Sequence, residues 1–485
     1  MPVPIINLAQ MRAWEKATWA VGQTEEEIIR RVGKRVARRA RKMTRAGDTI
    51  VILAGKGHNG EDATAAKLNL EGRKVKLVEL LLPASDLIKV EMIMREKPDL
   101  VIDGIFGIGL NRPLSEAWQK IIEVVNAARV PILAVDVPSG LNAETGGHFG
   151  AVIEAQVTLT IGAPKTGMLA PEACLAVGRL ETTGDVGLVP CPAKSDLYWT
   201  IPADFADYPP PRMVAAHKGN FGHAVVVAGS LGFHGAAVLA ARGALRAQPG
   251  LVTVLTQREV YVPVAAQLSA AMVGVWESSA SLPEKAGAVL IGPGLVLDTE
   301  NDKAAEKSGL RDFLRQLWRE SKSPLVVDAS ALDWLLSLAA ETASGAAQFP
   351  AGSLRVLTPH PGEAARLLGT TAEAVQANRV QSLRDLSKKF GGCWVVLKGS
   401  QTLIGRAASE LLVNSSGNPH LAQGGSGDLL GGFLTGLLAQ PRLQEDPAKT
   451  ISYAVWKHGA AADELQATRT HWTIEDLAAA LSSEV

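Results

Sequence analysis

The chain is poor in cysteine and has no excess of charge. Its 485 residues include three cysteines, Cys174, Cys191 and Cys393, which lie far apart in the sequence. An odd, scattered set argues against a disulfide framework and against a zinc site, and it is typical of a reducing cytoplasm. Lysine and arginine together number 49, and so do aspartate and glutamate. This balance gives no sign of a nucleic-acid-binding tail.

Signals for export and for membrane insertion are also missing. The first residues, MPVPIINLAQMRAWEKA, contain no basic segment followed by an apolar core, so we expect no signal peptide. No apolar run reaches membrane length without a glycine or a charge. The sequence therefore predicts a cytoplasmic protein with neither a membrane nor a nucleic acid as partner.

The sequence contains enough hydrophobic residues to form more than one hydrophobic core. Hydrophobic residues make up 47% of the chain, and the 47 glycines cluster after apolar runs, as in α/β proteins with ligand loops at strand ends. A chain of this length predicts two or three domains. Residues 190–216 are proline-rich and aperiodic, and the stiff segment 209–211 continues neither a helix nor a central strand. We place the boundary near residue 205, which gives domains 1–205 and 206–485.

The first domain opens with a helical pattern and continues with alternating strands and helices. Over residues 7–47 apolar residues recur at helical spacing and charges fill the gaps, so we expect helix there. The basic run from Arg35 to Lys42 has two interpretations: it binds an anion, or it is the solvated face of a helix. The alternation that follows predicts a parallel, doubly wound sheet. The expected strands are residues 49–53, 74–80, 100–102, 132–135 and 155–161.

Polar residues follow three of these strands. Because the carboxyl ends of parallel strands share one edge of a sheet, we expect Asn59, Asp103, Asp136 and Ser139 to converge there. Asn59, Asp103 and Ser139 offer only hard oxygen ligands, which suit a hard cation of low charge density better than zinc. The alternative is that each acid is an ordinary strand-end cap. Three polar loops in successive units favour a ligand site.

The second domain starts the same pattern afresh at residue 217. We expect strands at 224–228 and 251–255 and in the segments GAVLIGPGL, PLVVDASAL, LRVLTPHPGEAARLL and CWVVLKGSQTLIG. The ends of these strands carry Asp328, His360 and Lys398. Lys398, with the polar residues at 400–402, is suited to nucleotide phosphates, and His360 to a hydrogen bond with a polar substrate. Taken alone, His360 is equally a turn residue between two prolines, and Lys398 a solvated strand end.

The stretch GNPHLAQGGSGDLLGG, residues 417–432, runs from a polar loop into an apolar segment. We interpret it as a loop that feeds the N-terminus of a buried helix, where glycines allow a ligand to come close. The free N–H groups and the dipole of such a helix favour a phosphate. Asp428 is then placed to take a proton from a hydroxyl that attacks the phosphate. The alternative is that Ser426 or Asp428 only caps the helix.

Two common sequence motifs of phosphate-transferring proteins are missing from this second domain. No GK[ST] follows the glycines, so the stretch is not a Walker loop. The DFG, HRD and GxGxxG set of protein kinases is also missing.

Four segments of the first domain resemble the signature blocks of the NAD(P)H-hydrate epimerase domain: GKGHNGEDA, DGIFGIGLNRPL, VDVPSGLNAETG and APKTGMLAPEA. The resemblance implies a Rossmann-like three-layer fold, a potassium ion held by Asn59, Asp103 and Ser139, and a catalytic Asp136. It further implies contacts of the hydrated nicotinamide nucleotide with His58, Asn59, Gly60, Glu61, Asp62, Gly107, Ile108, Gly109, Leu110, Asn111, Arg112 and Pro113.

The first domain also departs from that family's pattern. His58 stands where the family has Asn, Glu61 stands where it has Gly, and IIRRVG replaces an LMExAG-like sequence. Glu61 adds bulk and negative charge where the backbone should approach a nucleotide phosphate. The ion site is kept and the substrate loop is altered. An alternative interpretation of this half is therefore a non-catalytic ligand-binding or dimerising module.

Residues 213–480 resemble the ADP-dependent NAD(P)H-hydrate dehydratase domain, which has a ribokinase-like three-layer fold. The shared segments are TPHPGE, the KGxxT loop and the GGSGD stretch. The resemblance implies ADP with Mg²⁺ as co-substrate and Asp428 as the base. The nucleotide would contact Lys398, Gly399, Ser400, Gln401, Thr402, Gly425, Ser426 and Gly427. The hydrate would contact Ala236, Gly294, His360 and Asp428.

The two resemblances together imply a bifunctional repair family. Its substrates are the hydrates of NADH and NADPH, and its second substrate is ADP. We expect epimerisation of the R and S hydrates by the first domain, ADP-dependent dehydration of the S hydrate by the second, and a homo-oligomer. The alternative for the second domain is a ribokinase-like kinase that acts on a vitamin precursor.

Overall fold

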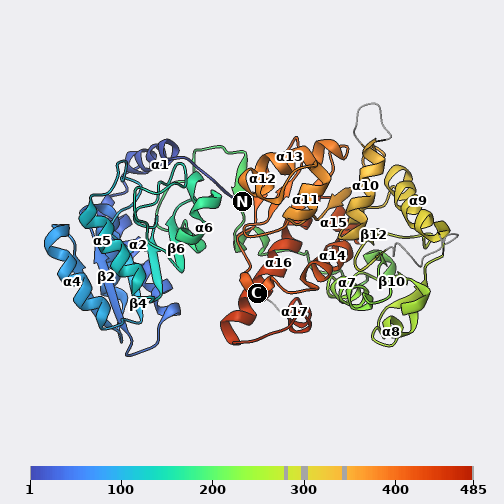
Figure 1. The fold of residues 1–485 in the computed structure, drawn as a ribbon, viewed down its shortest axis with the longest axis horizontal. Coiled ribbons are helices and arrows are strands. Elements are labelled where there is room, and N and C mark those ends of the chain that lie inside the picture. The colour runs from blue at the N-terminus through green and yellow to red at the C-terminus, as the bar shows by residue number, and fades with distance from the viewer. Residues whose placement is uncertain (1, 278–281, 297–303, 341–346, 483–485) are drawn as a thin grey trace. The chain divides into compact units, whose positions relative to one another are not determined.

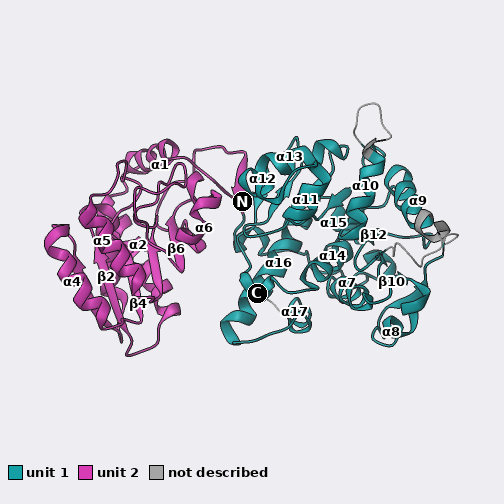
Figure 2. Ribbon diagram, viewed as in Figure 1, with its two compact units in different colours: residues 1–2, 200–485 teal, residues 3–199 magenta. Residues whose placement is uncertain are grey.

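The computed structural model of the protein describes residues 2–277, 282–296, 304–340 and 347–482. The chain forms two compact units, one of residues 3–199 and one of residues 1–2 and 200–485 (Figure 2). Within the described residues, no helix combines the length and the apolar character needed to cross a membrane.

The first unit contains a parallel sheet in the order β3-β2-β4-β5-β6-β7 (Figure 1). Its strands are β2 (Thr49–Ala54), β3 (Lys74–Glu79), β4 (Leu100–Gly104), β5 (Ile132–Val135), β6 (Val157–Ile161) and β7 (Arg179–Thr183). β1 (Val3–Pro4) pairs antiparallel with β8 (Leu197–Trp199). The parallel sheet confirms the α/β class predicted from the alternating strands and helices.

Helices cover both faces of this sheet. On one face, α2 (Glu25–Met43) and α3 (His58–Ala66) share an apolar cluster with Ile52 and Ile102. On the other, α4 (Pro83–Arg95) and α5 (Glu116–Ala127) pack on Val51 and Val101. Alternate residues of one strand therefore serve opposite layers. The smaller helices are α1 (Leu8–Ala20), α6 (Cys174–Val177) and the 3₁₀ turns at Lys67–Asn69, Thr166–Leu169, Pro171–Ala173 and Pro202–Phe205, the last in the second unit.

The helical region expected over residues 7–47 is two helices rather than one. α1 ends at Ala20, and Gly22 takes a φ of 88° before α2 begins at Glu25. The Thr24 side chain caps α2 by accepting a hydrogen bond from the Glu27 N–H. A cap and a left-handed glycine both interrupt the helical hydrogen bonds, and the apolar periodicity alone did not reveal them.

The second unit has its own sheet, which runs in the order β17-β16-β15-β14-β13-β12-β9-β10-β11. Neighbours from β15 to β11 are parallel, while β16 and β17 are added antiparallel. The strands are β9 (His223–Val227), β10 (Leu251–Thr256), β11 (Met272–Val275), β12 (Ala288–Ile291), β13 (Leu325–Val327), β14 (Arg355–Leu357), β15 (Trp394–Leu397), β16 (Leu403–Gly405) and β17 (Leu411–Val413).

Both faces of this second sheet are buried. Val226 and Leu290 lie in the apolar cluster of α7, α14, α16 and α17, and the alternating residues Val225 and Val289 are buried as well. The helices of this apolar cluster are α7 (His234–Arg246), α14 (Ser426–Leu438), α16 (Pro447–Thr468) and α17 (Ile474–Ala480). The remaining helices are α8 (Tyr261–Ala265), α9 (Ala304–Glu320), α10 (Ser330–Ala340), α11 (Pro361–Leu368), α12 (Ala372–Ala377), α13 (Arg379–Lys389), α15 (Pro441–Gln444) and the 3₁₀ turns Lys218–Phe221, Arg258–Val260 and Pro419–Leu421.

Helices α7 and α14 run parallel in close contact. A Cβ added to Gly432 would lie 1.8 Å from the Ala240 carbonyl oxygen, and one added to Gly436 would lie 2.5 Å from that of Ala244. Only glycine permits this approach. Because matching residues advance together along the two helices, α7 and α14 begin at the same end of the unit, and this end carries the candidate site.

Candidate functional site

The glycine stretch forms an open helix N-terminus, as the sequence predicts. α14 begins after Gly425, whose φ of 93° is left-handed, and no side chain caps its first turn. A Cβ on Gly425 would lie 2.3 Å from Leu239 Cδ1. The alternative interpretation, in which Ser426 or Asp428 caps the helix, is therefore wrong. The uncapped N–H groups and the helix dipole together make a site for an anion.

Lys398 lies over this helix start. Its Nζ donates to Asp328 Oδ1 at 2.9 Å and lies 3.8 Å from Glu363 Oε2. A Cβ on Gly427 would be 3.3 Å from the same nitrogen, so the absence of a side chain at 427 leaves room for the ammonium group. The Lys398 side chain is 20% exposed, which rules out the solvated strand end. An ammonium group above an uncapped helix N-terminus strengthens the anion site.

Asp428 occupies the first turn of α14. Burial raises the pKa of its carboxyl to about 6, with a further increase from Asp328 and Glu363 and an opposing decrease from Lys398. The group is thus mainly ionised at neutral pH, and its affinity for a proton exceeds that of an exposed aspartate. Such a carboxylate is suited to general-base chemistry.

His360 caps α11 with one ring nitrogen and leaves the other available. Its Nδ1 accepts hydrogen bonds from the N–H groups of Gly362 at 3.0 Å and Glu363 at 3.3 Å. In return, Glu363 Oε2 accepts from the His360 N–H at 2.8 Å, which completes a capping box. His360 Nε2 lies 3.5 Å from Glu363 Oε1, and the ring is half exposed. His360 therefore acts as the N-cap of α11, and its contact with a ligand through Nε2 stays a prediction.

The remaining residues predicted for this site come from its rim. A Cβ on Gly294 would lie 2.7 Å from the Ala236 Cβ, so these two positions adjoin at the start of α7. In the loop after Lys398, Gly399 takes a φ of 132° and Thr402 Oγ1 donates to its carbonyl oxygen at 2.9 Å. Ser400 is exposed and Gln401 is partly buried, with a left-handed φ of 53°.

Three residues of the site were missed from the sequence. Asp328 and Glu363 both contact Lys398, and both stand in motifs that the sequence pattern already singled out, at a strand end and in a helix first turn. His458 lies inside α16, where it forms a backbone hydrogen bond with Ser426. Burial lowers the pKa of His458 to about 4, so the ring beside the anion site is neutral. No sequence signal marks a histidine in the middle of a helix.

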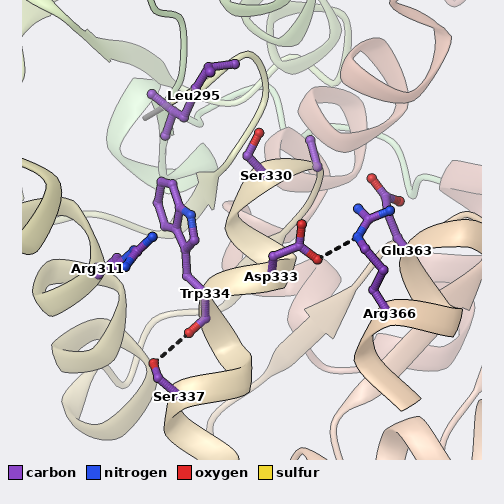
Figure 3. Close-up of a pocket in the computed structure, with 10 residues that line it drawn as sticks. Leu295, Arg311, Ser330, Asp333, Trp334, Ser337, Glu363 and Arg366 are labelled. Carbon is purple, nitrogen blue, oxygen red and sulfur yellow. Dashed lines mark hydrogen bonds and ion pairs between the residues drawn. The ribbon is translucent and has the colours of Figure 1, made fainter. Parts of the chain in front are cut away.

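A pocket of about 570 Å³ adjoins this cluster and shares Glu363 with it (Figure 3). Ser330, Asp333 and Trp334 line it from α10, and Arg311 lines it from α9. Its lining residues are Leu295, Val296, Arg311, Ala329, Ser330, Asp333, Trp334, Ser337, Glu363 and Arg366. Arg366 Nε donates to Asp333 Oδ1 at 3.0 Å on one side of it. One aromatic ring and two guanidinium groups give this pocket the chemistry of a nucleotide site.

The first unit brings the three predicted cation ligands together. Asp103 Oδ1 accepts from Ser139 Oγ at 2.6 Å, and Asp103 Oδ2 accepts from the Ser139 N–H at 2.8 Å. Asn59 Nδ2 donates to the Phe106 carbonyl oxygen at 3.0 Å, and Ser139 Oγ lies 3.3 Å from the same oxygen. A carboxylate, a hydroxyl and a carbonyl oxygen thus meet at one place, beside the amide group of Asn59.

This oxygen set fits a monovalent cation. Asp103 is fully buried, and burial raises the pKa of its carboxyl to about 6, although hydrogen bonds from Ser139 and Ile105 lower it in part. Among the described residues, no lysine or arginine forms an ion pair with Asp103. A buried carboxylate without a counter-charge is costly, and a bound cation would remove that cost.

Asp136 pairs with a lysine that the sequence analysis did not select. Lys165 Nζ donates to Asp136 Oδ1 at 2.5 Å and to Thr160 Oγ1 at 2.8 Å, and the lysine is fully buried. Asp136 itself takes a left-handed φ of 60°, which is unusual for a non-glycine residue and is often found at functional sites. Lys165 lies in APKTGMLAPEA, one of the segments that carried the family resemblance, so the sequence could have pointed to this residue.

Asp62 is the second acidic group of this site. Burial raises the pKa of its carboxyl to about 8, with further increases from Asp136, Glu61 and Glu15. Its Oδ1 has no hydrogen-bond partner within the described part of the chain. Asp62 is therefore protonated at neutral pH. Glu15, on α1, was also missed; burial and Asp136 raise its pKa.

The altered residues of the nucleotide loop face outward. His58 Nε2 lies 3.5 Å from Glu25 Oε2, and both His58 and Glu61 are exposed. Gly60 cannot be replaced without conflict, because its Cβ would lie 2.0 Å from the Gly55 carbonyl oxygen. The predicted second loop touches the first at Gly107, where a Cβ would be 3.3 Å from Asn59 Oδ1.

The residues of that second loop, 107–113, differ in how far they are buried. Ile108 packs against the apolar cluster of Met11 and Trp14, and Leu110 packs against the cluster of α4 and α5. The tip is exposed, at Gly109, Asn111, Arg112 and Pro113.

Both halves of the chain match known families. The family NAD(P)H-hydrate dehydratase matches residues 224–484, and the family YjeF-related protein N-terminus matches residues 83–167. The bifunctional NAD(P)H-hydrate repair enzyme Nnr of Gloeobacter violaceus is 34% identical over 96% of this chain and 94% of its own length. The enzyme of the same name from Escherichia coli K12 is 32% identical over 94% of this chain and 88% of its own.

Solved structures resemble the second half. A ribokinase-like superfamily protein from Enterococcus faecalis has a TM-score of 0.50 at 26% identity and covers 60% of this chain and 95% of its own. The ADP/ATP-dependent NAD(P)H-hydrate dehydratase from Bacillus subtilis, co-crystallized with ATP/Mg²⁺, has a TM-score of 0.47 at 30% identity and covers 56% of this chain and 91% of its own.

Proposed function

This chain belongs to the family of bifunctional NAD(P)H-hydrate repair enzymes, and from that membership we propose how its two units divide the work. The substrates are NADH and NADPH that have gained water at C6 of the nicotinamide ring. The second unit removes this water from the S hydrate at the expense of ADP. The first unit interconverts the R and S hydrates, so that both can be repaired.

The observation that carries the dehydratase proposal is the meeting of Lys398, Gly427 and Asp428 at the uncapped start of α14. The phosphate to be transferred would lie against the N–H groups of Gly425–Gly427, beneath Lys398. Asp428 takes the proton from the C6 hydroxyl as the hydroxyl oxygen bonds to phosphorus and the bond from phosphorus to the AMP oxygen breaks. A poor leaving group thereby becomes a good one.

Elimination completes the repair. The bond between C6 and the phosphate oxygen breaks, a proton leaves C5, and a C5–C6 double bond forms. His360, whose ring is oriented by the capping bonds of its Nδ1, would hold the substrate through Nε2. The pocket around Trp334, with Arg311 and Arg366, would bind part of a nucleotide.

Magnesium fits this site by the chemistry of its residues. The carboxylates of Asp328, Glu363 and Asp428 lie around a single lysine, and burial, followed by Asp328 and Glu363, raises the pKa of Asp428. Among the described residues, no group of three or more His, Cys, Asp or Glu side chains could hold a metal ion by itself. Mg²⁺ prefers one or two carboxylates together with substrate phosphates, so Asp328 and Glu363 would hold it with ADP, and Asp428 stays available as the base. When bound, the ion neutralises charge on the phosphates.

Epimerisation requires a bond at C6 to break and re-form on the other face, with a proton moved each time. The first unit offers a charged pair, Asp136 and Lys165, beside the protonated carboxyl of Asp62. Asp136 would accept a proton and Asp62 would donate one. Potassium would be held by Asn59, Asp103 and Ser139 and would hold their loops in position.

A mixed R and S hydrate solution tests both units at once. With ADP and Mg²⁺ we expect full recovery of the dihydronicotinamide absorbance, in a fast phase for the S form and a slower phase for the R form. Replacing K⁺ by tetramethylammonium should slow only the slower phase. Recovery that stops when the S form is consumed would mean that the first unit is a non-catalytic module. No recovery with either ADP or ATP, but stable phosphorylation of an added vitamin-precursor alcohol, would overturn the dehydratase proposal.

A further inference from the structure

The first unit has a second pocket that the repair reaction does not use. It has a volume of about 460 Å³ and opens along one side of α2. Its lining residues are Arg31, Lys34, Arg35, Arg38, Arg41, Asn69 and Asp185. None of the residues proposed above for the hydrate, the cation or proton transfer is among them. Five cationic side chains and one carboxylate give its lining a charge of about +4 when all are ionised.

The cations form one stripe on the helix. The pairs 31/34, 31/35, 34/38, 35/38 and 38/41 are each three or four residues apart, and such neighbours lie side by side on a helix surface. Like charges at this spacing repel one another by roughly 0.2–0.5 kcal/mol for each pair. The stripe extends for about 15 Å, from ten residues at 1.5 Å each. The chain as a whole has no net charge, so a concentration of mutually repelling cations on one helix face is consistent with a bound anion.

Two of the arginines are already held in place. Arg31 Nη1 donates to Gln23 Oε1 at 2.7 Å, and a Cβ on Gly187 would be 1.8 Å from the same nitrogen. Arg35 pairs with the Asp185 carboxylate and donates to the Asp185 carbonyl oxygen at 3.2 Å. Fixed guanidinium groups lose little freedom when a ligand binds, which favours affinity.

The other three cations of the pocket are Lys34, Arg38 and Arg41. In the described part of the chain, no hydrogen bond or ion pair engages the side chains of Lys34, Arg38 or Arg41, and all three are exposed. The nearby Glu181 is already paired with Arg39, through a contact of 2.7 Å to Arg39 Nε. Two held arginines and three unengaged cations around one hollow are suited to several phosphate groups.

We propose that this pocket, which we call the α2 basic pocket, binds a small polyphosphate, an anion with two or more linked phosphate groups. Its concave volume lies within the range of small-molecule sites, whereas a nucleic acid is usually met by a more extended surface. The stripe is longer than one phosphate, so a chain of phosphates gains contacts that a single phosphate does not. The site is separate from the two sites of the repair reaction.

The helix that forms the α2 basic pocket also packs against the helix that carries residues of the epimerase loop. A Cβ on Gly33 of α2 would lie 2.6 Å from the backbone of Ala65 on α3, so the two helices are in direct backbone contact. α3 begins at His58 and carries Asn59 and Asp62 among its first five residues. A polyphosphate that holds α2 therefore acts on the helix next to the loop.

Calorimetric titration of the full chain with phosphate, pyrophosphate and tripolyphosphate tests the proposal. We expect affinity to increase along that series. The triple variant Lys34→Gln/Arg38→Gln/Arg41→Gln should bind tripolyphosphate at least tenfold more weakly than the wild type. The control Arg30→Gln/Lys42→Gln removes two exposed cations of the same helix that do not line the pocket, and it should change binding by less than twofold. The anion site at α14 is the same in the wild type, the triple variant and the control. Differences in affinity between these proteins therefore report on the α2 basic pocket.

The outcomes separate the pocket from general charge effects. A triple variant that binds within twofold of the wild type would overturn the proposal, and so would a control that loses as much affinity as the triple variant. A 20-nucleotide single strand that binds more tightly than tripolyphosphate, with the same dependence on the three cations, would replace the small polyphosphate with a nucleic acid. The thermal unfolding temperature of the triple variant should not fall, because like-charge repulsion is removed. If it does fall, Arg38→Gln alone replaces it, with at least a threefold loss expected.

Discussion

The two units use the same local device for different chemistry. α3 begins after Gly57, with a φ of 115°, and α14 begins after Gly425, with a φ of 93°. Neither helix has a side-chain cap, and each carries an acid in its first turns, Asp62 in one and Asp428 in the other. A helix start alone therefore does not decide what a site does.

What differs is the charge that faces each helix start. At the start of α14, burial raises the pKa of Asp428 to about 6, with a further increase from Asp328 and Glu363, and the ammonium of Lys398, next to the position of Gly427, opposes this increase. Beside α3 the neighbours that act on Asp62 are carboxylates, and its pKa rises to about 8. At neutral pH, Asp428 at one start is therefore mainly ionised, and Asp62 near the other is mainly protonated. Burial raises the pKa of both acids, and the contrast comes from Lys398, whose opposing charge acts on Asp428, while the charges that act on Asp62 are all carboxylates.

The largest expected effect comes from Asp428. The Asp428→Asn change removes the proposed base and should lower kcat for dehydration of the S hydrate by about 10²–10⁴-fold. The first unit should still interconvert the hydrates at the wild-type rate, measured by separating R and S forms by chromatography. Asp207→Asn, an exposed carboxylate of the same unit, is the matched control and should leave both rates unchanged. Equal activity of the Asp428 variant and the control would remove the proposed role of Asp428.

The second effect should appear in the other unit alone. Lys165→Met leaves Asp136 buried without its partner, and removing one member of such a pair costs about 3–5 kcal/mol. We expect epimerisation to fall to background and hydrogen exchange of the amides of β5 and β6 to accelerate. Dehydration of pure S hydrate should keep its wild-type rate.

A double variant separates catalysis from stability. Lys165→Met/Asp136→Asn replaces the buried pair with uncharged side chains and should recover much of the lost protection, because no unpaired charge remains and asparagine tolerates the left-handed φ of 60° at position 136. It should not recover epimerisation. Recovery of both would mean that the pair serves only to stabilise the unit.

The smallest effect is a difference in pH profile. Dehydration should require ionised Asp428, so kcat/KM should fall about tenfold for each pH unit below 6 and level off above it. Epimerisation should require protonated Asp62, so its rate should fall above about pH 8. Rates measured from pH 5 to 9 on the same preparation test the contrast. Identical profiles for the two reactions would contradict the assignment of separate groups.

Much of the fold was predictable because it depends on local pattern. Apolar runs that alternate with amphipathic segments gave the α/β class, and the comparisons and the parallel sheets confirm it. The family was predictable for a related reason: the ligand loops are contiguous segments such as TPHPGE and GGSGD, and a contiguous segment can be read directly. The match to the first half covers residues 83–167, which excludes the altered loop at 58–62.

The sequence determined which groups are available: glycines for the open helix starts, oxygens for a cation, an acid beside a phosphate site. Only the tertiary structure decided their partners and protonation. Lys165 became the partner of Asp136, Asp328 the partner of Lys398, and His458 a neutral ring next to Ser426. These outcomes depend on burial and on distances between residues far apart in the chain, and both quantities exist only once the chain has folded.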